Sequence, residues 1–184
     1  MDHFYQKITG WFDFADLYSD MVKTASQNAQ FVELGCFFGR STAYMAVEIL
    51  NSRKNIIFDV VDKFNFNEDS NLDEIAQMYG YKGDFYNVFI QNIEPVKFVI
   101  RHIWRMDTAA AAEMYQDRSV DFVFVDDSHT YSNTRADVIA WLPKLKSGGV
   151  IAGHDIGRDS VKKAVDELLD WQKVSASCWY YRKD

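Results

Sequence analysis

The feature that most constrains this fold is a recurring unit, in which a short apolar run ends at polar residues and a helical pattern follows. The runs are nearly continuous in apolar character, as strands buried on both faces are. The strands predicted in this way are Phe31–Leu34, Ile56–Val61, Lys97–Trp104, Val120–Val125 and Val150–Ala152.

Apolar residues at helical spacing lie between these runs. The predicted helices are Phe12–Gln27, Ser41–Arg53, Tyr131–Leu142 and Ser160–Asp170, with Ser147-Gly148-Gly149 ending the third, and the tail Val174–Arg182 is expected to form a closing hairpin. Strands that alternate with helices imply an α/β fold, with a parallel sheet covered on both faces. Ligands of such sheets bind beyond the carboxyl ends of the strands, so the polar residues after each run are candidate site residues.

Composition narrows the class of protein. The 184 residues fit one domain, 1–184, whose residues 1–30 form an N-terminal helical segment. The net charge of −7, without a Lys/Arg-rich run, argues against a nucleic-acid partner. No apolar stretch approaches the roughly 20 residues that span a bilayer, so no membrane partner is expected. Cys36 and Cys178 form no zinc pattern, and Met1-Asp2-His3 does not begin a secretory signal, so we expect a cytoplasmic location.

Residues 64–86 interrupt the alternation. The segment is polar at its start and aromatic at its end. Loops of this length in a compact domain are usually functional or disordered. We expect a lid on the substrate side, and the alternative is a tolerated insertion.

The turn after the first predicted strand points to a cofactor. Gly35 and Gly39 form G-x-x-x-G instead of the dinucleotide pattern G-x-G-x-x-G, and Glu33 precedes them. A carboxylate there would repel a pyrophosphate but suit an ammonium group. Asp62, 23 positions after Gly39, can accept both ribose hydroxyls. A nucleoside with an amino-acid end, such as S-adenosylmethionine, fits; alternatively, the glycines serve turns and Asp62 caps a loop.

Acids and histidines follow the fourth and fifth predicted strands. Asp126 and Asp155 could converge there as hard oxygen ligands, which suit Mg²⁺. A cation would orient a substrate hydroxyl, and His129 could accept its proton. Alternatively, Asp126-Asp127 caps the next helix and His129 is structural. His154 could also ligate a metal, although imidazole prefers softer ions than Mg²⁺.

The segment Glu33-Leu34-Gly35-x-x-x-Gly39-x-Ser41 resembles motif I of class I S-adenosylmethionine-dependent methyltransferases, specifically the small metal-dependent O-methyltransferases of the catechol type. Two later segments, Phe124–Tyr131 and Gly148–Asp155, resemble the macrocin and mycinamicin sugar O-methyltransferase branch. The resemblance extends over residues 10–182. It implies a Rossmann-like fold with a mostly parallel seven-stranded sheet, helices on both faces and a C-terminal antiparallel hairpin.

The resemblance also implies roles for matching residues. The methionine end of the cofactor would lie at the glycine turn, the ribose at Asp62, and the adenine beside Asp107. The implied cofactor site comprises Glu33, Gly35, Phe37, Gly39, Ser41, Asp62, Lys63, Asp107, Thr108 and Asp126. The implied cation ligands are Asp126, His154 and Asp155, and the implied catalytic residues are His129, as general base, and Asp126.

The predicted function is therefore methyl transfer to a hydroxyl of a small acceptor, such as a sugar or glycosylated metabolite, with help from a divalent cation. A metal-independent enzyme, an N-methyltransferase and a non-catalytic S-adenosylmethionine-binding protein remain alternatives. Glu33 and the missing middle glycine disfavour a nucleotide-dependent oxidoreductase. Relatives in this branch often form oligomers, so a homo-oligomer is a further hypothesis.

Overall fold

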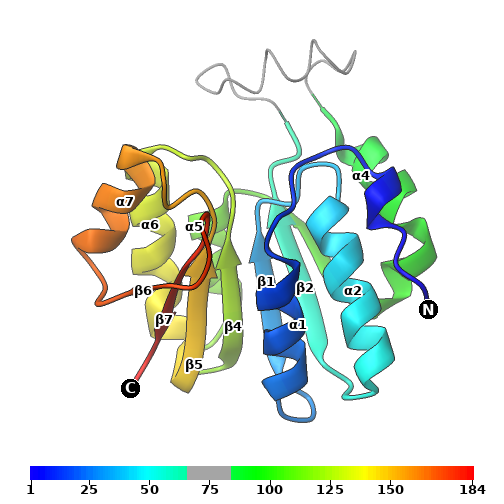
Figure 1. Ribbon diagram of the computed structural model, residues 1–184, viewed down its shortest axis with the longest axis horizontal. Helices are drawn as coiled ribbons and strands as arrows, with labels where there is room; N and C mark the ends of the chain where they lie inside the picture. The colour runs from blue at the N-terminus through cyan, green and yellow to red at the C-terminus, as the bar shows by residue number, and fades with distance from the viewer. Residues whose placement is uncertain (66–83) are drawn as a thin grey trace.

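The computed structural model describes residues 1–65 and 84–184. Its centre is a seven-stranded sheet in the order β3-β2-β1-β4-β5-β7-β6 (Figure 1). The strands are β1 Gln30–Leu34, β2 Ile57–Asp62, β3 Ile100–Arg105, β4 Val120–Val125, β5 Leu145–Gly153, β6 Gln172–Lys173 and β7 Trp179–Arg182. Strands β1 to β5 pair in parallel, whereas β7 pairs antiparallel with both β5 and β6. The predicted Rossmann-like sheet with its antiparallel hairpin is confirmed.

Helices cover both faces of the sheet, and Figure 1 shows α1, α2 and α4 on one side of the molecule and α6 and α7 on the other. The α-helices are α1 Ala15–Thr24, α2 Arg40–Ser52, α4 Tyr86–Ile93, α5 Thr108–Ala111, α6 Tyr131–Trp141 and α7 Asp159–Asp166. Short 3₁₀ helices are η1 Tyr5–Lys7, η2 Glu94–Val99, η3 Ala112–Met114 and η4 Leu142–Lys144.

Alternate residues of the central strands feed two separate cores. In β4, Phe122 and Phe124 pack with α1 and α2 in an aromatic-rich core, whereas Val123 and Val125 pack with α6 and α7. Because both faces of the strand are covered, its sequence is apolar at nearly every position. This two-sided burial explains why the central strands were recognisable in the sequence.

Several predicted boundaries are wrong, including the end of α7, which is Asp166 and not Asp170, and the start of the C-terminal hairpin, whose first strand is Gln172–Lys173. Residues 97–99 belong to η2, which has a proline in its first turn, so β3 begins only at Ile100. The last parallel strand, β5, begins at Leu145 and includes Ser147-Gly148-Gly149, which therefore do not end α6. A register shift between Val120 and Phe122 in the β4–β5 pairing accommodates this glycine segment. The first helix is also shorter than predicted and spans Ala15–Thr24.

The expected lid falls largely at residues 66–83, which lie outside the described residues, so it stays a prediction. The described ends of the segment are held together. The backbone N–H of Phe85 donates to the carbonyl of Phe64, and both side chains are buried. The segment leads into α4, a helix that the sequence pattern did not predict, which adds Phe89 and Ile93 to the core.

Within the described residues, no helix combines the length and apolar character needed to cross a bilayer.

Candidate functional site

The carboxyl ends of β1 and β4 meet where the strand order reverses, the usual place for a ligand in an open α/β sheet. Here the turn after β1 lies directly on the turn after β4. Gly35 has φ +83°, and a Cβ at this position would overlap the carbonyl of Asp126. The backbone N–H of Asp126 donates to the carbonyl of Leu34 at 2.8 Å. The glycine turn and the residues after β4 therefore form one continuous surface.

Glu33 lies beneath this surface and is only 1% exposed. One carboxyl oxygen accepts a hydrogen bond from Tyr18 Oη at 2.9 Å, and the other accepts one from Thr42 Oγ1 at 2.5 Å. Burial raises the pKa of Glu33 to about 7, although these hydroxyl donors oppose the rise. The carboxyl therefore titrates near neutral pH while held between α1 and α2.

Asp62 ends β2, and its carboxylate accepts hydrogen bonds from three backbone N–H groups. Its Oδ2 accepts the N–H groups of Cys36 and Phe37 at 2.7 and 3.0 Å, and its Oδ1 accepts that of Phe64 at 2.6 Å. Burial, then the charge of Asp127, raises its pKa to about 6. The predicted ribose acceptor thus also organises the glycine turn.

Gly39 and Phe37 of the turn pack against apolar side chains from other segments. Gly39 has φ +89°, and a Cβ there would lie 2.7 Å from Cγ2 of Ile93 in α4. Phe37 has φ +47° and its ring centroid is 6.2 Å from that of Trp11, which is 61% exposed. Ser41 is buried in the first turn of α2. Packing within the chain accounts for both glycines, as the turn alternative supposes, and leaves the cofactor prediction open.

The residues expected near adenine lie at the ends of β2 and β3. Lys63 Nζ is 2.7 Å from Asp107 Oδ2, and this hydrogen bond lowers the pKa of Asp107. Asp107 also caps α5 by accepting the N–H of Ala110 at 3.1 Å. Thr108 Oγ1 donates to Asp127 Oδ2 at 3.3 Å. These predicted residues are brought together, along the same edge of the sheet as Asp62.

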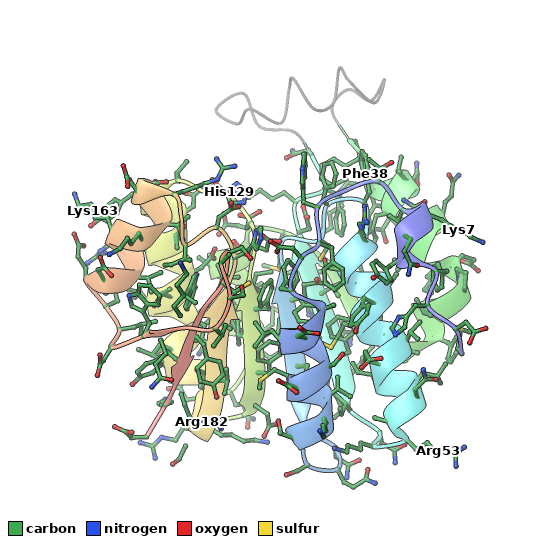
Figure 2. All side chains as sticks on the ribbon, in the orientation of Figure 1. Lys7, Phe38, Arg53, His129, Lys163 and Arg182 are labelled. Carbon is green, nitrogen blue, oxygen red and sulfur yellow. The ribbon has the colours of Figure 1, made fainter. Side chains whose placement is uncertain are left out.

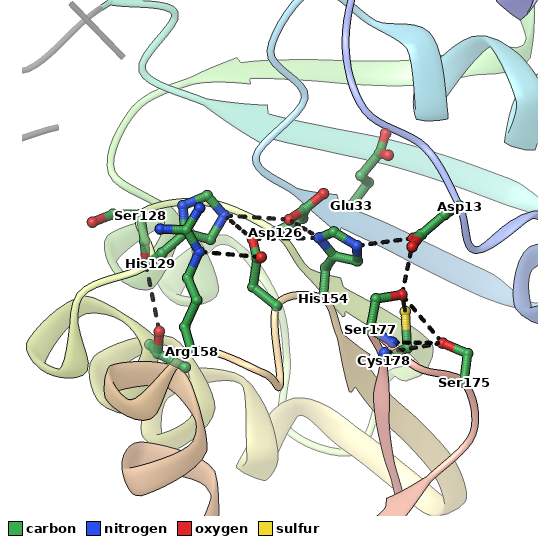
Figure 3. Close-up of polar contacts among 12 residues, drawn as sticks. Asp13, Glu33, Asp126, Ser128, His129, His154, Arg158, Ser175, Ser177 and Cys178 are labelled. Carbon is green, nitrogen blue, oxygen red and sulfur yellow. Dashed lines mark hydrogen bonds and ion pairs between the residues drawn. The ribbon is translucent and has the colours of Figure 1, made fainter. Parts of the chain in front are cut away.

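A cluster of titratable groups follows β4 and β5 (Figure 3). Ligand atoms of Asp126, His154 and Asp155 all lie within 4.8 Å of one another. His129 Nε2 is 2.7 Å from Asp155 Oδ2 and 3.6 Å from Asp126 Oδ1. The structure thus gathers all four residues that the sequence assigned to metal binding and catalysis. Figure 2 shows His129 and Phe38 at the edge of the molecule where the parallel strands end.

Two further residues of this cluster have no sequence signal that singled them out. Asp13 Oδ1, from the segment before α1, is 2.9 Å from His154 Nε2 and also accepts Ser177 Oγ at 2.9 Å. Arg158 Nε is 3.1 Å from Asp155 Oδ1. Asp13 is 141 positions from His154, so no local pattern could reveal the contact. Arg158 lies three positions after Asp155, but only the turn conformation brings the two together.

The charges of the cluster shift its pKa values strongly. Burial alone would lower the pKa of both histidines, but hydrogen bonds and charges from Asp126 and Asp155 raise it to about 9 for His129 and about 11 for His154. Burial opposes ionisation of Asp155, yet the two histidines hold its pKa below the usual range. At neutral pH these imidazoles, together with the Arg158 guanidinium, are the cations beside the two carboxylates.

Tight packing of the chain holds the cluster. Asp155 has φ +55°, a strained conformation for a non-glycine residue of the kind found at functional sites. Gly153 leaves room for Trp179, because a Cβ there would lie 2.5 Å from its Cζ2. Trp179 Nε1 is buried without an acceptor among the described residues. Trp179 lines a small cavity with Asp126, His129 and His154.

Comparison with known proteins gives a family. A family profile described as "Methyltransferase domain" matches residues 32–156. Among curated proteins, an uncharacterized protein y4gI of Sinorhizobium fredii is 34% identical over 83 residues. The match covers 45% of this chain and 9% of that protein, so the chain matches only a small part of its curated relative.

Solved structures share the fold at low sequence identity. The O-methyltransferase NovP has a TM-score of 0.68 at 14% identity, covering 92% of this chain and 77% of NovP. CalS11, a calicheamicin methyltransferase, has a TM-score of 0.63 at 16% identity, with coverage of 91% and 76%. A putative rRNA-methylase of Clostridium thermocellum has a TM-score of 0.64 at 14% identity, with coverage of 96% and 100%.

Proposed function

Since the chain belongs to a family of methyltransferase domains, we propose that it transfers a methyl group from S-adenosylmethionine to a hydroxyl oxygen of a small acceptor. The observation that carries the proposal is the contact between Gly35 and Asp126. It puts the candidate cofactor turn beside the cluster that can bind and deprotonate a hydroxyl. The methyl donor and the acceptor oxygen would then lie next to each other at the carboxyl ends of β1 and β4.

The chemistry of Glu33 and Asp62 fits such a cofactor. Both carboxyls currently accept hydrogen bonds from hydroxyl or amide groups of the chain. The ammonium and ribose hydroxyls of S-adenosylmethionine are donors of the same kind. Burial is the main cause of the raised pKa of both acids, and a nearby positive charge would lower it. An ammonium ligand near Glu33 would supply that charge.

The carboxylate and imidazole groups of Asp126, His154 and Asp155 suit a divalent cation, which these three residues would hold. Two carboxylate oxygens suit Mg²⁺, whereas an imidazole nitrogen suits transition ions. A bound cation would orient the acceptor hydroxyl, lower its pKa and, by neutralising the two carboxylates, favour the neutral form of His129.

The remaining chemistry belongs to the side chains. His129 Nε2 would take the hydroxyl proton as the oxygen attacks the methyl carbon, and the sulfonium leaves as a neutral thioether. Because this donor is already activated, the chain chiefly aligns oxygen, carbon and sulfur and excludes water. Trp179 lines the same cavity, and its Nε1 is a buried donor without an acceptor among the described residues.

A sugar or glycosylated acceptor is our preferred substrate class. One CalS11 structure is described as a TDP-rhamnose 3'-O-methyltransferase, and its TM-score is 0.60. Since a putative rRNA-methylase shares the fold as well, fold alone does not choose between a sugar and an RNA. The net charge of −7 favours the small acceptor, because a nucleic-acid site needs clustered basic residues.

Calorimetric titration with S-adenosylmethionine and S-adenosylhomocysteine tests the cofactor, with and without Mg²⁺. Micromolar binding is expected, and a folded protein that binds neither compound would overturn the proposal. Mass spectrometry of sugar nucleotides incubated with enzyme and cofactor then tests the acceptor. His129→Gln should lose turnover and retain cofactor binding. His102→Gln is the matched control, because His102 lies in β3 and faces Asp59 of β2, outside the cluster.

A further inference from the structure

His154 is the unusual member of the candidate cation site, because it places nitrogen beside two carboxylates. Its side chain is 13% exposed, and both ring nitrogens have defined neighbours. Nδ1 is 3.5 Å from Asp126 Oδ1 and 3.4 Å from Asp155 Oδ2. Of the two ring nitrogens, Nδ1 is therefore the one that lies beside the carboxylate oxygens of the candidate site.

Asp13 determines which nitrogen of His154 is free to act as a ligand. Its Oδ1 is 2.9 Å from His154 Nε2, and a carboxylate can only accept at this contact, so Nε2 carries a hydrogen. Ser177 Oγ donates to the same oxygen and orients the carboxylate. Phe14 packs beside the imidazole, with ring centroids 5.1 Å apart. With Nε2–H engaged by Asp13, the Nδ1 lone pair of the neutral ring points toward Asp126 and Asp155.

This arrangement is the one that metal-binding histidines usually adopt, with one nitrogen on the metal and the other donating to a carboxylate. We infer that Asp126, His154 and Asp155 form a mixed nitrogen–oxygen site that prefers a first-row divalent transition ion, such as Co²⁺ or Zn²⁺, over Mg²⁺, and that Asp13 is the positioning residue that aims His154 Nδ1 into it. The preference follows from the donor set, because Mg²⁺ favours an all-oxygen shell. The inference rests on the proposed function for the presence of a cation, and it replaces the Mg²⁺ expected from the carboxylates alone.

Metal binding by the full chain tests the inference without any turnover. Co²⁺, Zn²⁺ and Mg²⁺ are titrated separately by calorimetry, and the visible absorption of bound Co²⁺ reports its ligands. We expect Co²⁺ and Zn²⁺ to bind at least 10-fold more tightly than Mg²⁺. Equal or tighter binding of Mg²⁺, or no binding of Co²⁺ or Zn²⁺ to folded protein, would overturn the inference.

Two substitutions identify the residues responsible. His154→Asp makes the donor set all oxygen, so the preference should shift toward Mg²⁺ and the Co²⁺ spectrum should change. Asp13→Asn should weaken Co²⁺ binding about 10- to 100-fold, as loss of a metal ligand's carboxylate partner typically does. Asp16→Asn is the matched control, since Asp16 is an exposed acid at the start of α1. An Asp13→Asn variant that binds Co²⁺ like the control would refute the positioning role.

Two controls distinguish a change in metal binding from a folding defect and from failure of the proposed function. Circular dichroism checks each variant, and Ser177→Ala replaces Asp13→Asn if the latter does not fold, because it loosens the same carboxylate. S-adenosylhomocysteine binding is measured on the same samples. Cofactor binding without transition-metal preference defeats only the present inference, whereas metal preference without cofactor binding defeats only the proposed function.

Discussion

Replacing Glu33 by glutamine should stabilise the protein, and increasingly so as the pH rises. The carboxyl is 1% exposed, and burial raises its pKa from 4.5 to about 7. Between these values the folded state binds more protons than the unfolded chain, so the free energy of unfolding falls as the pH rises. The favourable contribution is complete below pH 4.5 and lost as the pH passes through about 7. The full loss corresponds to about 3 kcal/mol.

Glutamine has nearly the same shape and remains neutral, and the hydroxyls of Tyr18 and Thr42 can still bond to it. The Glu33→Gln variant should therefore exceed the parent by about 1 kcal/mol at pH 5 and about 3 kcal/mol at pH 8. At pH 8 this corresponds to a melting temperature roughly 6–12 °C higher. Urea unfolding of both proteins across this pH range measures the difference. Glu113→Gln, at an exposed position, is the control.

The reasoning is refuted if the difference between Glu33→Gln and the parent does not grow with pH. A variant that is less stable than the parent at pH 8 would also refute it, because Glu33 would then be a stabilising anion. Adding S-adenosylmethionine extends the test. If its ammonium group faces Glu33, the cofactor should stabilise the parent more than the variant.

The remaining predictions concern the glycine turn and the proposed base. Gly39→Ala should cost about 1–3 kcal/mol in urea unfolding, since it combines a strained φ with a clash against Ile93; unchanged stability would show that α4 can move. Asp62→Ala leaves buried N–H groups of the turn without an acceptor and should cost about 1–3 kcal/mol, with weaker binding of S-adenosylhomocysteine by calorimetry. His129→Ala should lower kcat about 10²- to 10⁴-fold with unchanged cofactor affinity, and a lost affinity would instead make His129 structural.

The sequence predicted the central strands because their two faces are both buried. Phe122 and Phe124 serve one core while Val123 and Val125 serve the other, which leaves an uninterrupted apolar run. The same argument fails at the sheet edge. Residues 97–99 look like part of β3, but proline in the first turn of η2 favours a 3₁₀ helix there. Element type was therefore predictable where burial is two-sided, and boundaries were not.

The site was predictable to the extent that it lies at strand ends. Asp126, His129, His154 and Asp155 follow two adjacent parallel strands, so topology alone brings them together. Asp13 comes from a segment whose position depends on tertiary packing of α1, and its sequence neighbours carry no signal for the contact. The present partners of Glu33 and Asp62 depend on packing in the same way.

The link from Ser177 through Asp13 to His154 also bears on how the protein is made. Asp13 and Ser177 are separated by 164 positions. At a synthesis rate of roughly 5–20 residues per second, Asp13 would wait roughly 10–30 s on the ribosome before Ser177 is added. Contacts of such high sequence separation also form late in folding, because a large loop must close first. The contact of Asp13 with Ser177 can therefore form only after Ser177 has been added and β7 can dock on the sheet.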